Sequence, residues 1–371
     1  MISEAAVRKL AGRTGDPAVT SVYLDVDGRH RPVRADYEAA FERLTDELRR
    51  RARARADARL AKNVDADIEV MRSWLGHGVD RTETRGVALF SNAERGYFEA
   101  VRLPRSVRDE VALGPTPRVT QIVALLDEHE RFLVALVDRE RLRLLRFELG
   151  EVEELPALTD AVPTTADARG ELGSWANYTE EAIRAHFRRA ADHLAATLAR
   201  WPAHRLLLGG PEEAVAGLEG HLTQQVAGMV AGRVNVRVAA PLKEIAEAAL
   251  EVEESVERHH EAEAVEALRQ RAAGGERAVV GLAATLTALQ GGRVDTLLVS
   301  QDFTAPGAEC PSCRHVGVDV RQCPRCGTTN MEIDDVVEVA VDLAVGQRAT
   351  VEFCRGGELD QFGRIGALER Y

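Results

Sequence analysis

The spacing of apolar residues in the first third of the chain predicts a mixed α/β domain. Apolar and polar residues alternate over residues 19–25, as they do in a β-strand. Residues 36–79 predict one or two long helices, and residues 86–91 and 97–103 predict two further strands. Prolines and glycines between residues 104 and 117 then indicate a linker to the next domain.

A second segment begins near residue 118 and opens with three short apolar runs. Residues 121–126, 132–138 and 142–149 are separated by polar turns, which predicts a meander of three strands. Residues 151–177 are polar, and we expect them to form a long loop.

A long amphipathic helix is predicted after this loop. Thr179 is a suitable N-cap because acidic residues follow it in the first turn, and Pro202 ends the pattern. Its apolar positions recur every three or four residues, at Ile183, Phe187, Ala190, Ala191, Leu194 and Leu198. A strand at 204–208, a helix at 211–222 and a strand at 234–238 then predict an α/β layer.

The last third of the chain reads as a second α/β layer that is interrupted by a cysteine-rich insertion. Its predicted elements are helices at 242–270, 278–290 and 334–345 and strands at 294–299, 349–353 and 365–371. The predicted fold class is therefore α/β (α+β) with three domains, at 1–117, 118–239 and 240–371.

Composition limits the function classes. The 371 residues are 45% hydrophobic and 29% charged, and the net charge of −12 argues against a general affinity for nucleic-acid phosphates. Any contact with RNA must therefore come from local basic patches. The first residues contain no apolar run typical of a signal peptide, and no apolar stretch is long enough to span a bilayer. We expect a cytoplasmic protein.

Two CxxC pairs lie close together in the insertion at 308–328. Cys310, Cys313, Cys323 and Cys326 have the spacing of a zinc ribbon, in which four thiolates bind Zn²⁺ tetrahedrally. A site with four protein ligands has no open position, so the predicted zinc is structural. The fifth cysteine, Cys354, ends an apolar strand and is expected to be a buried thiol.

Two groups of arginines are candidate RNA-binding residues. The first is the run Arg49, Arg50, Arg51, Arg53 and Arg55, and the second is Arg184, Arg188 and Arg189. Either group is able to contact phosphates, and either is also explained as a solvated helix face balanced by nearby acids. Both interpretations stay open at this point.

The polar segment at 170–178 is the candidate functional loop. Its glycines permit unusual backbone angles, and Trp175 is suited either to stacking on a base or to packing on its own domain. The chain contains no nucleophile-elbow, zinc-protease, Walker or dinucleotide-binding motif.

The order of these features resembles the archaeo-eukaryotic class I release factors and their relative Pelota. The helix at 179–194, the cysteine ribbon and the closing run at 362–371, which ends in Arg-Tyr, are similar to features of that family. The resemblance is greatest to bacterial members of the Balon type, which are ribosome hibernation factors. It implies an RNase-H-like central domain and an L7Ae-like C-terminal domain.

The resemblance also implies partners and a test of activity. The partners would be the ribosome, through its RNA and A site, and in addition tRNA and an elongation factor. Active release factors carry Gly-Gly-Gln at the tip of the central-domain loop, whereas here Gly173 is followed by Ser174, Trp175 and, further on, Asn177. No glutamine occurs between residues 123 and 221, and the N-terminal domain lacks the family's stop-codon motif.

Three functional hypotheses follow. The first is a ribosome-binding translation factor that occupies the A site, in hibernation or in the handling of stalled ribosomes, without hydrolysis. The second is a peptidyl-tRNA hydrolase, or release or rescue factor, that uses the variant loop at 170–178. The third is an RNA-binding module that does not act on ribosomes.

Overall fold

The computed structural model describes residues 4–370, apart from 14, 56, 129, 162–171, 276, 311, 319, 320 and 334 and the side chains of 172–178. Contacts divide the chain into two compact units. Unit 1 comprises residues 1–128 and 261–371, and unit 2 comprises residues 129–260. Helix α8 (Leu242–Gly274) begins in unit 2 and ends in unit 1.

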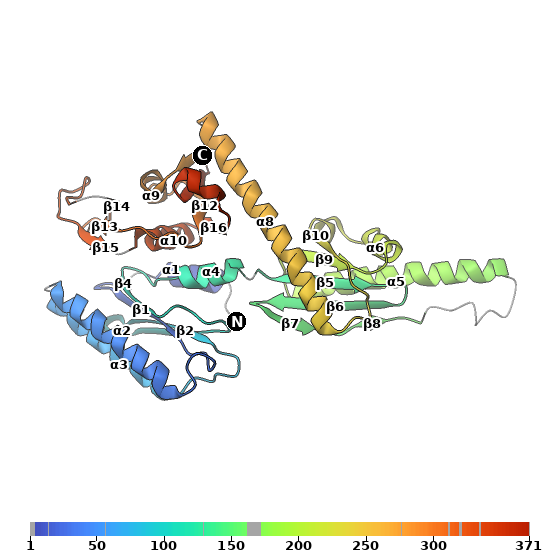
Figure 1. Cartoon of the computed structure of the whole chain (residues 1–371), viewed down its shortest axis with the longest axis horizontal. Coiled ribbons are helices and arrows are strands. Elements are labelled where there is room, and N and C mark those ends of the chain that lie inside the picture. The colour runs from blue at the N-terminus through green and yellow to red at the C-terminus, as the bar shows by residue number, and fades with distance from the viewer. Residues whose placement is uncertain are drawn as a thin grey trace. The chain divides into compact units, whose positions relative to one another are not determined.

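The N-terminal part of unit 1 is an antiparallel sheet with two helices on one face (Figure 1). Its strands lie in the order β3-β2-β1-β4, with β1 at Val19–Asp25, β2 at Gly86–Asn92, β3 at Tyr97–Leu103 and β4 at Glu110–Gly114. Helices α2 (Arg34–Ala54) and α3 (Ala58–Gly76) bury their apolar faces against it, with Phe41, Ile68 and Met71 in the core. Short helix α1 (Glu4–Ala11) precedes this sheet, and the 3₁₀ turn η1 (Ala93–Arg95) joins β2 to β3.

The C-terminal part of unit 1 contains a second sheet, ordered β11-β17-β12-β16. The strands are β11 (Ala278–Val280), β12 (Val294–Ser300), β16 (Thr350–Cys354) and β17 (Ile365–Glu369). Helices α9 (Leu282–Gln290) and α10 (Val336–Gly346) and the 3₁₀ segment η3 (Gly357–Phe362) accompany it. Between β12 and α10 the chain forms a small antiparallel sheet. Its strands are β13 (Gly307–Glu309), β14 (Val316–Gly317) and β15 (Met331–Ile333), and they lie in the order β14-β13-β15.

Unit 2 has a mixed sheet ordered β10-β9-β5-β6-β7, with β8 paired to β6. The strands are β5 (Phe132–Val137), β6 (Arg141–Glu148), β7 (Glu151–Glu154), β8 (Leu158–Thr159), β9 (Arg205–Gly209) and β10 (Val230–Val234). Helices α5 (Leu172–Arg200), α6 (Glu212–Glu219) and α7 (Gln224–Ala227) follow β8 or β9. One face of the sheet packs on α5 and α6 and the other on α8, so the central strands are apolar on both faces (Figure 1).

Several sequence-based predictions of secondary structure are confirmed, and others are wrong. The run at 121–126 is part of helix α4 (Thr120–Glu128), not a strand, because a short apolar run fits either period and its packing decides. Its Ile122 is fully buried, and α4 packs against β16. The expected linker contains strand β4, which pairs with β1 from Val19↔Gly114 to Tyr23↔Glu110.

Three boundaries also differ from the prediction. Residues 278–280 form strand β11 rather than the start of a helix, because they pair with β17. Strand β10 is at Val230–Val234 rather than at 234–238. Helix α5 begins at Leu172, so Thr179 is not its N-cap, and β7 and β8 occupy part of the expected loop. No helix among the described residues is both long and apolar enough to cross a bilayer.

Candidate metal centre and charged surfaces

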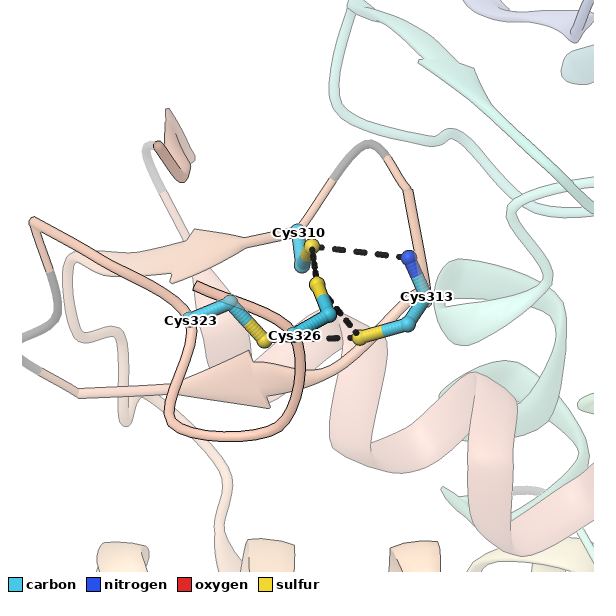
Figure 2. Close-up of side chains that lie close together, drawn as sticks. All are labelled: Cys310, Cys313, Cys323 and Cys326. Atoms are coloured by element: carbon cyan, nitrogen blue, oxygen red, sulfur yellow. Dashed lines mark hydrogen bonds between the residues drawn. The ribbon is translucent and has the colours of Figure 1, made fainter. Parts of the chain in front are cut away.

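The four predicted ligands converge in the structure. Sγ of Cys310 lies 3.4 Å from Sγ of Cys326, and Sγ of Cys313 lies 3.3 Å from Sγ of Cys323 and 3.6 Å from Sγ of Cys326. All four sulfurs lie within 4.8 Å of one another, and Figure 2 shows them pointing to a common centre. The sequence spacing thus predicted the cluster correctly.

Each CxxC pair sits on a turn of the same design. The N–H of Cys310 donates to the carbonyl of His315, and the N–H of Arg314 donates to the carbonyl of Cys310. In the second turn the N–H of Cys323 donates to the carbonyl of Thr328, and the N–H of Gly327 donates to the carbonyl of Cys323. The turns need a residue with positive φ, and Arg314 (61°) and Gly327 (75°) supply it.

The geometry of the sulfurs fits a tetrahedral metal ion. Metal–sulfur bonds of 2.3 Å imply sulfur–sulfur edges of about 3.8 Å, close to the separations found here. The N–H groups of Cys313 and Arg325 each lie 3.4 Å from a cysteine sulfur, which favours thiolates. Four thiolate ligands complete the coordination, so the cluster is suited to a structural role.

The ribbon is attached to unit 1 by few but specific contacts. The side chain of Gln290 at the end of α9 donates to the carbonyl of Val316 and accepts from its N–H. Gly307 lies so close to Val336 of α10 that an added Cβ would be 2.6 Å from the Val336 Cβ. These contacts fix β13 and β14 to the helices of the C-terminal sheet.

The fifth cysteine is separate from this cluster. Cys354 ends β16 and is buried among Leu268, Leu298 and Leu359. Burial, together with the nearby carboxylates, raises the pKa of its thiol to about 12. The side chain is therefore an inert core thiol, as predicted.

The predicted arginine run on α2 is largely paired with acids of its own unit. Arg49 lies within 3.4 Å of carboxylate oxygens of Asp46, Asp65 and Glu69. Arg51 pairs with Glu47 at 2.5 Å and Arg53 with Asp65 at 3.6 Å, whereas Arg55 lines a cavity of about 540 Å³ in unit 1. Among the described residues, the exposed side chain of Arg50 has no ion-pair partner.

The arginines on α5 differ among themselves. Arg184 pairs with Glu180 at 2.5 Å, and Arg189 pairs with Asp160 at 3.0 Å. Arg188 is exposed and has no ion pair within the described part of the chain. It is therefore the member of this group that is available to an external anion.

The structure also reveals a buried histidine that the sequence analysis missed. Nδ1 of His186 lies 2.7 Å from Oδ2 of Asp160, and the His186 side chain is fully buried. Bonds to His186 and Arg189 lower the pKa of Asp160 despite its partial burial, which acts in the opposite direction. His186 directly precedes Phe187 of the apolar stripe, which was the available signal.

Two further ionic clusters depend on residues far apart in sequence. In unit 1 Arg118 lies 3.3 Å from Asp342 and 3.5 Å from Glu338, both on α10. Burial raises the pKa of Asp342 to about 6, and Arg118 opposes this rise. In unit 2 Arg205 contacts the carboxylates of Glu130, Glu253 and Glu257 at 3.2, 2.8 and 2.5 Å. No local motif indicates either cluster.

The candidate loop falls partly outside the described residues. Gly170 lies outside them, and only the backbone of Gly173, Ser174, Trp175 and Asn177 is described. The backbone of these last four residues belongs to the first turns of α5, which begins at Leu172. The roles assigned to them therefore stay predictions.

Comparison with known protein families finds a similarity in the central part of the chain. Residues 117–254 match the sequence profile of bacterial archaeo-eukaryotic release factor family 10. No curated protein matches.

Solved structures with some likeness to the chain include three archaeal proteins. The archaeal translation termination factor aRF1 is 17% identical, with 100% of this chain and 99% of that chain covered and a TM-score of 0.28. The C-terminal domain of a Methanosarcina mazei peptide chain release factor is 26% identical. The match covers 35% of this chain and 93% of that chain, with a TM-score of 0.28. An archaeal Pelota, described as ribosome-bound with ABCE1, is 14% identical. The match covers 74% of this chain and 72% of that chain, with a TM-score of 0.43. Over residues 117–254, the chain is therefore similar to the bacterial archaeo-eukaryotic release factors of family 10.

Proposed function

We propose that this protein is a ribosome-binding translation factor that occupies the A site, in hibernation or in the handling of stalled ribosomes. The similarity of residues 117–254 to bacterial archaeo-eukaryotic release factor family 10 is the observation that supports this most directly. Under this proposal the chain acts through three domains, at 1–117, 118–239 and 240–371. The second is RNase-H-like and the third L7Ae-like.

The proposed factor binds without hydrolysing peptidyl-tRNA. A hydrolytic tip needs backbone freedom and a group that positions water beside the developing charge. Here Ser174 follows Gly173 and no glutamine occurs between residues 123 and 221. The placement of residues 173–178 in a helix also supports binding, because helical backbone angles suit any residue and make no use of glycine.

The proposal includes one structural Zn²⁺ per chain, held by Cys310, Cys313, Cys323 and Cys326. The sulfur separations of 3.3 to 3.6 Å support it. In this position the metal joins the two turns of a sheet that has little apolar core of its own. Metal analysis of protein purified without chelators is expected to find about one zinc per chain, as the four-thiolate site requires.

The proposed RNA contacts centre on Arg188. It is exposed and carries no ion pair among the described residues, whereas its neighbours Arg184 and Arg189 must exchange a carboxylate for a phosphate. On α2, Arg49, Arg51 and Arg53 are likewise paired with carboxylates, whereas Arg50 has no ion pair among the described residues. Arg188 is therefore expected to contribute more to RNA binding than Arg184.

Co-sedimentation with purified ribosomes over a salt series tests this. Each phosphate contact removed is expected to flatten the plot of log affinity against log salt by roughly one unit. Arg188→Gln should do so, and Arg200→Gln, an exposed arginine at the end of the same helix, is the matched control. Equal sedimentation of wild type and both variants at every salt concentration would show that Arg188 does not contact ribosomal RNA.

A second assay separates binding from hydrolysis. Ribosomes carrying labelled peptidyl-tRNA are mixed with saturating protein, and free peptide is followed over time. We expect occupancy without release above the factor-free rate. Rapid release that Ser174→Ala or Asn177→Ala abolishes would instead establish the peptidyl-tRNA hydrolase, and binding to isolated RNA but not to ribosomes would favour the third hypothesis.

A further inference from the structure

The four cysteines of the ribbon differ in their access to solvent. The side chains of Cys310 and Cys323 are buried, that of Cys313 is half-buried, and that of Cys326 is exposed. Gly327 follows Cys326, and a Cβ added there would meet no atom within 4 Å. A small reagent in solution therefore reaches the sulfur of Cys326 before it reaches the other three.

The two accessible sulfurs belong to opposite turns and lie close together. Sγ of Cys326 is 3.6 Å from Sγ of Cys313, and Figure 2 shows these two side chains facing each other across the cluster. A disulfide requires sulfurs about 2.05 Å apart, so a shift of roughly 1.5 Å in these turns would form the bond. Cys310, at 3.4 Å from Cys326, is held beside β13 and is fully enclosed.

Two exposed arginines lie close to Cys326 in the sequence. Arg321 and Arg325 are exposed near it in sequence, and Arg314 of the other turn pairs with Glu309 at 3.3 Å. Cysteines that react with oxidants are partly exposed and lie in electropositive surroundings, and a metal-bound thiol is already deprotonated. Cys354 has none of these properties, because it is buried and lies near carboxylates.

We propose that Cys326 is a peroxide-reactive thiolate that forms a disulfide with Cys313 and thereby releases the metal from the ribbon. This inference rests on the zinc occupancy proposed above. Oxidation leaves only Cys310 and Cys323 as thiolate ligands, half of the set that a closed site needs. The ribbon would then lose its order while the sheet of β12, β16 and β17 keeps its own core.

The chemistry balances with hydrogen peroxide as the oxidant. The Cys326 thiolate attacks one peroxide oxygen, the O–O bond breaks, and a sulfenic acid and hydroxide form. The Cys313 thiolate then attacks the sulfur of that sulfenic acid, which forms the S–S bond and releases a second hydroxide. Two electrons pass from the two sulfurs to one peroxide, and a dithiol reverses the reaction.

The experiment uses full-length protein whose zinc content is measured first. A content well below one equivalent at this stage would contradict the proposed zinc site and not the reactivity. Peroxide is then added, zinc release is followed with a metallochromic chelator, and remaining thiols are alkylated for peptide mass spectrometry. Trypsin cleaves after Arg321 and Arg325, so Cys323 and Cys326 fall in different peptides.

We expect release of nearly all the zinc together with a disulfide between Cys313 and Cys326, while Cys354 stays alkylatable. Reduction with a dithiol and added zinc should restore the metal content. Retention of zinc while glutathione in the same tube is fully oxidised would overturn the proposal. So would a first disulfide that lacks Cys326, or oxidation of Cys354 at the same rate.

A charge variant tests the electrostatic part without removing a ligand. Arg325→Glu is expected to slow zinc release about threefold, since it reverses one charge near the sulfur. Arg200→Glu, an exposed arginine of unit 2, is the matched control and should release zinc at the wild-type rate. Equal rates for all three proteins would exclude a role for Arg325.

Discussion

The ribbon of β13, β14 and β15 and the sheet of unit 2 differ in what holds them together. In the ribbon the buried side chains are mainly Ala308, Val316 and two of the cysteines. In unit 2 the strands β5, β6 and β9 bury leucines and valines on both faces, against α5 and α6 on one side and α8 on the other.

This difference indicates two sources of stability in one chain. Three very short strands bury too little apolar surface to fold alone, so with the zinc proposed above the ribbon depends on its four cysteine ligands and on Gln290. The unit 2 sheet needs no ligand, because burial of one large aliphatic side chain already contributes about 2 kcal/mol. A change that removes one source should leave the other region intact.

The largest expected effect is the loss of the proposed zinc from the ribbon. Cys310→Ser removes one thiolate from the site and should reduce bound zinc to roughly a tenth of an equivalent or less, because structural zinc binding amounts to about 10 kcal/mol. Metal analysis and amide hydrogen exchange would measure it, with protection lost at 307–333 and kept in β5 and β9. Cys354→Ser is the control and should keep its zinc.

A cavity in the core of unit 2 should destabilise that unit and leave the ribbon unchanged. Leu207 of β9 is fully buried, and Leu207→Ala is expected to lower the free energy of unfolding of unit 2 by about 3 kcal/mol. Zinc content should not change. Leu250→Ala, at a side chain that is 47% exposed, should shift the denaturant midpoint little. Zinc loss in the Leu207 variant would show that the two regions are not independent.

Removal of the mostly buried Arg205 side chain should lower the free energy of unfolding by as much as the Leu207 cavity does, or slightly less. Arg205→Met leaves the carboxylates of Glu130, Glu253 and Glu257 without their shared partner, and about 3 kcal/mol of stability should be lost at neutral pH. The loss should shrink as pH falls, because burial raises the pKa of Glu253 and its carboxylate becomes protonated. Arg184→Met is the control, because its ion pair with Glu180 is exposed and contributes less than about 1 kcal/mol.

The smallest effect concerns the pH dependence of unit 1. The pKa of Asp342 is raised to about 6 in the folded protein, so the folded state binds more protons than the unfolded state below that pH. Its contribution to stability is therefore present at low pH and is lost as pH rises through about 6. Asp342→Asn keeps the acceptor for the Val119 N–H and removes this contribution to the pH dependence.

Chemical denaturation between pH 4 and 7 would measure the contribution of Asp342 to the pH dependence of stability. The stability of wild type relative to Asp342→Asn should fall by on the order of 2 kcal/mol over this range. The ribbon responds in the opposite direction, since acid protonates its thiolates and releases metal. Parallel curves for the two proteins would contradict the assignment to Asp342.

The sequence by itself determined the features that depend on local spacing. The two CxxC pairs predicted the sulfur cluster because each turn places two ligands within a few residues. The two-residue period located β1, and the long apolar stripe located most of α5. The burial of Cys354 also followed from its position at the end of an apolar strand.

Only the tertiary structure decided the features that depend on partners distant in sequence. Residues 121–126 fit a strand or a helix, and packing of Ile122 in unit 1 selects the helix. Strand β4 exists because β1 offers it a free edge, and β11 because β17 does. Likewise Arg49 and Arg205 are neutralised by carboxylates that only folding brings near, since charge pairing acts through space and not along the chain.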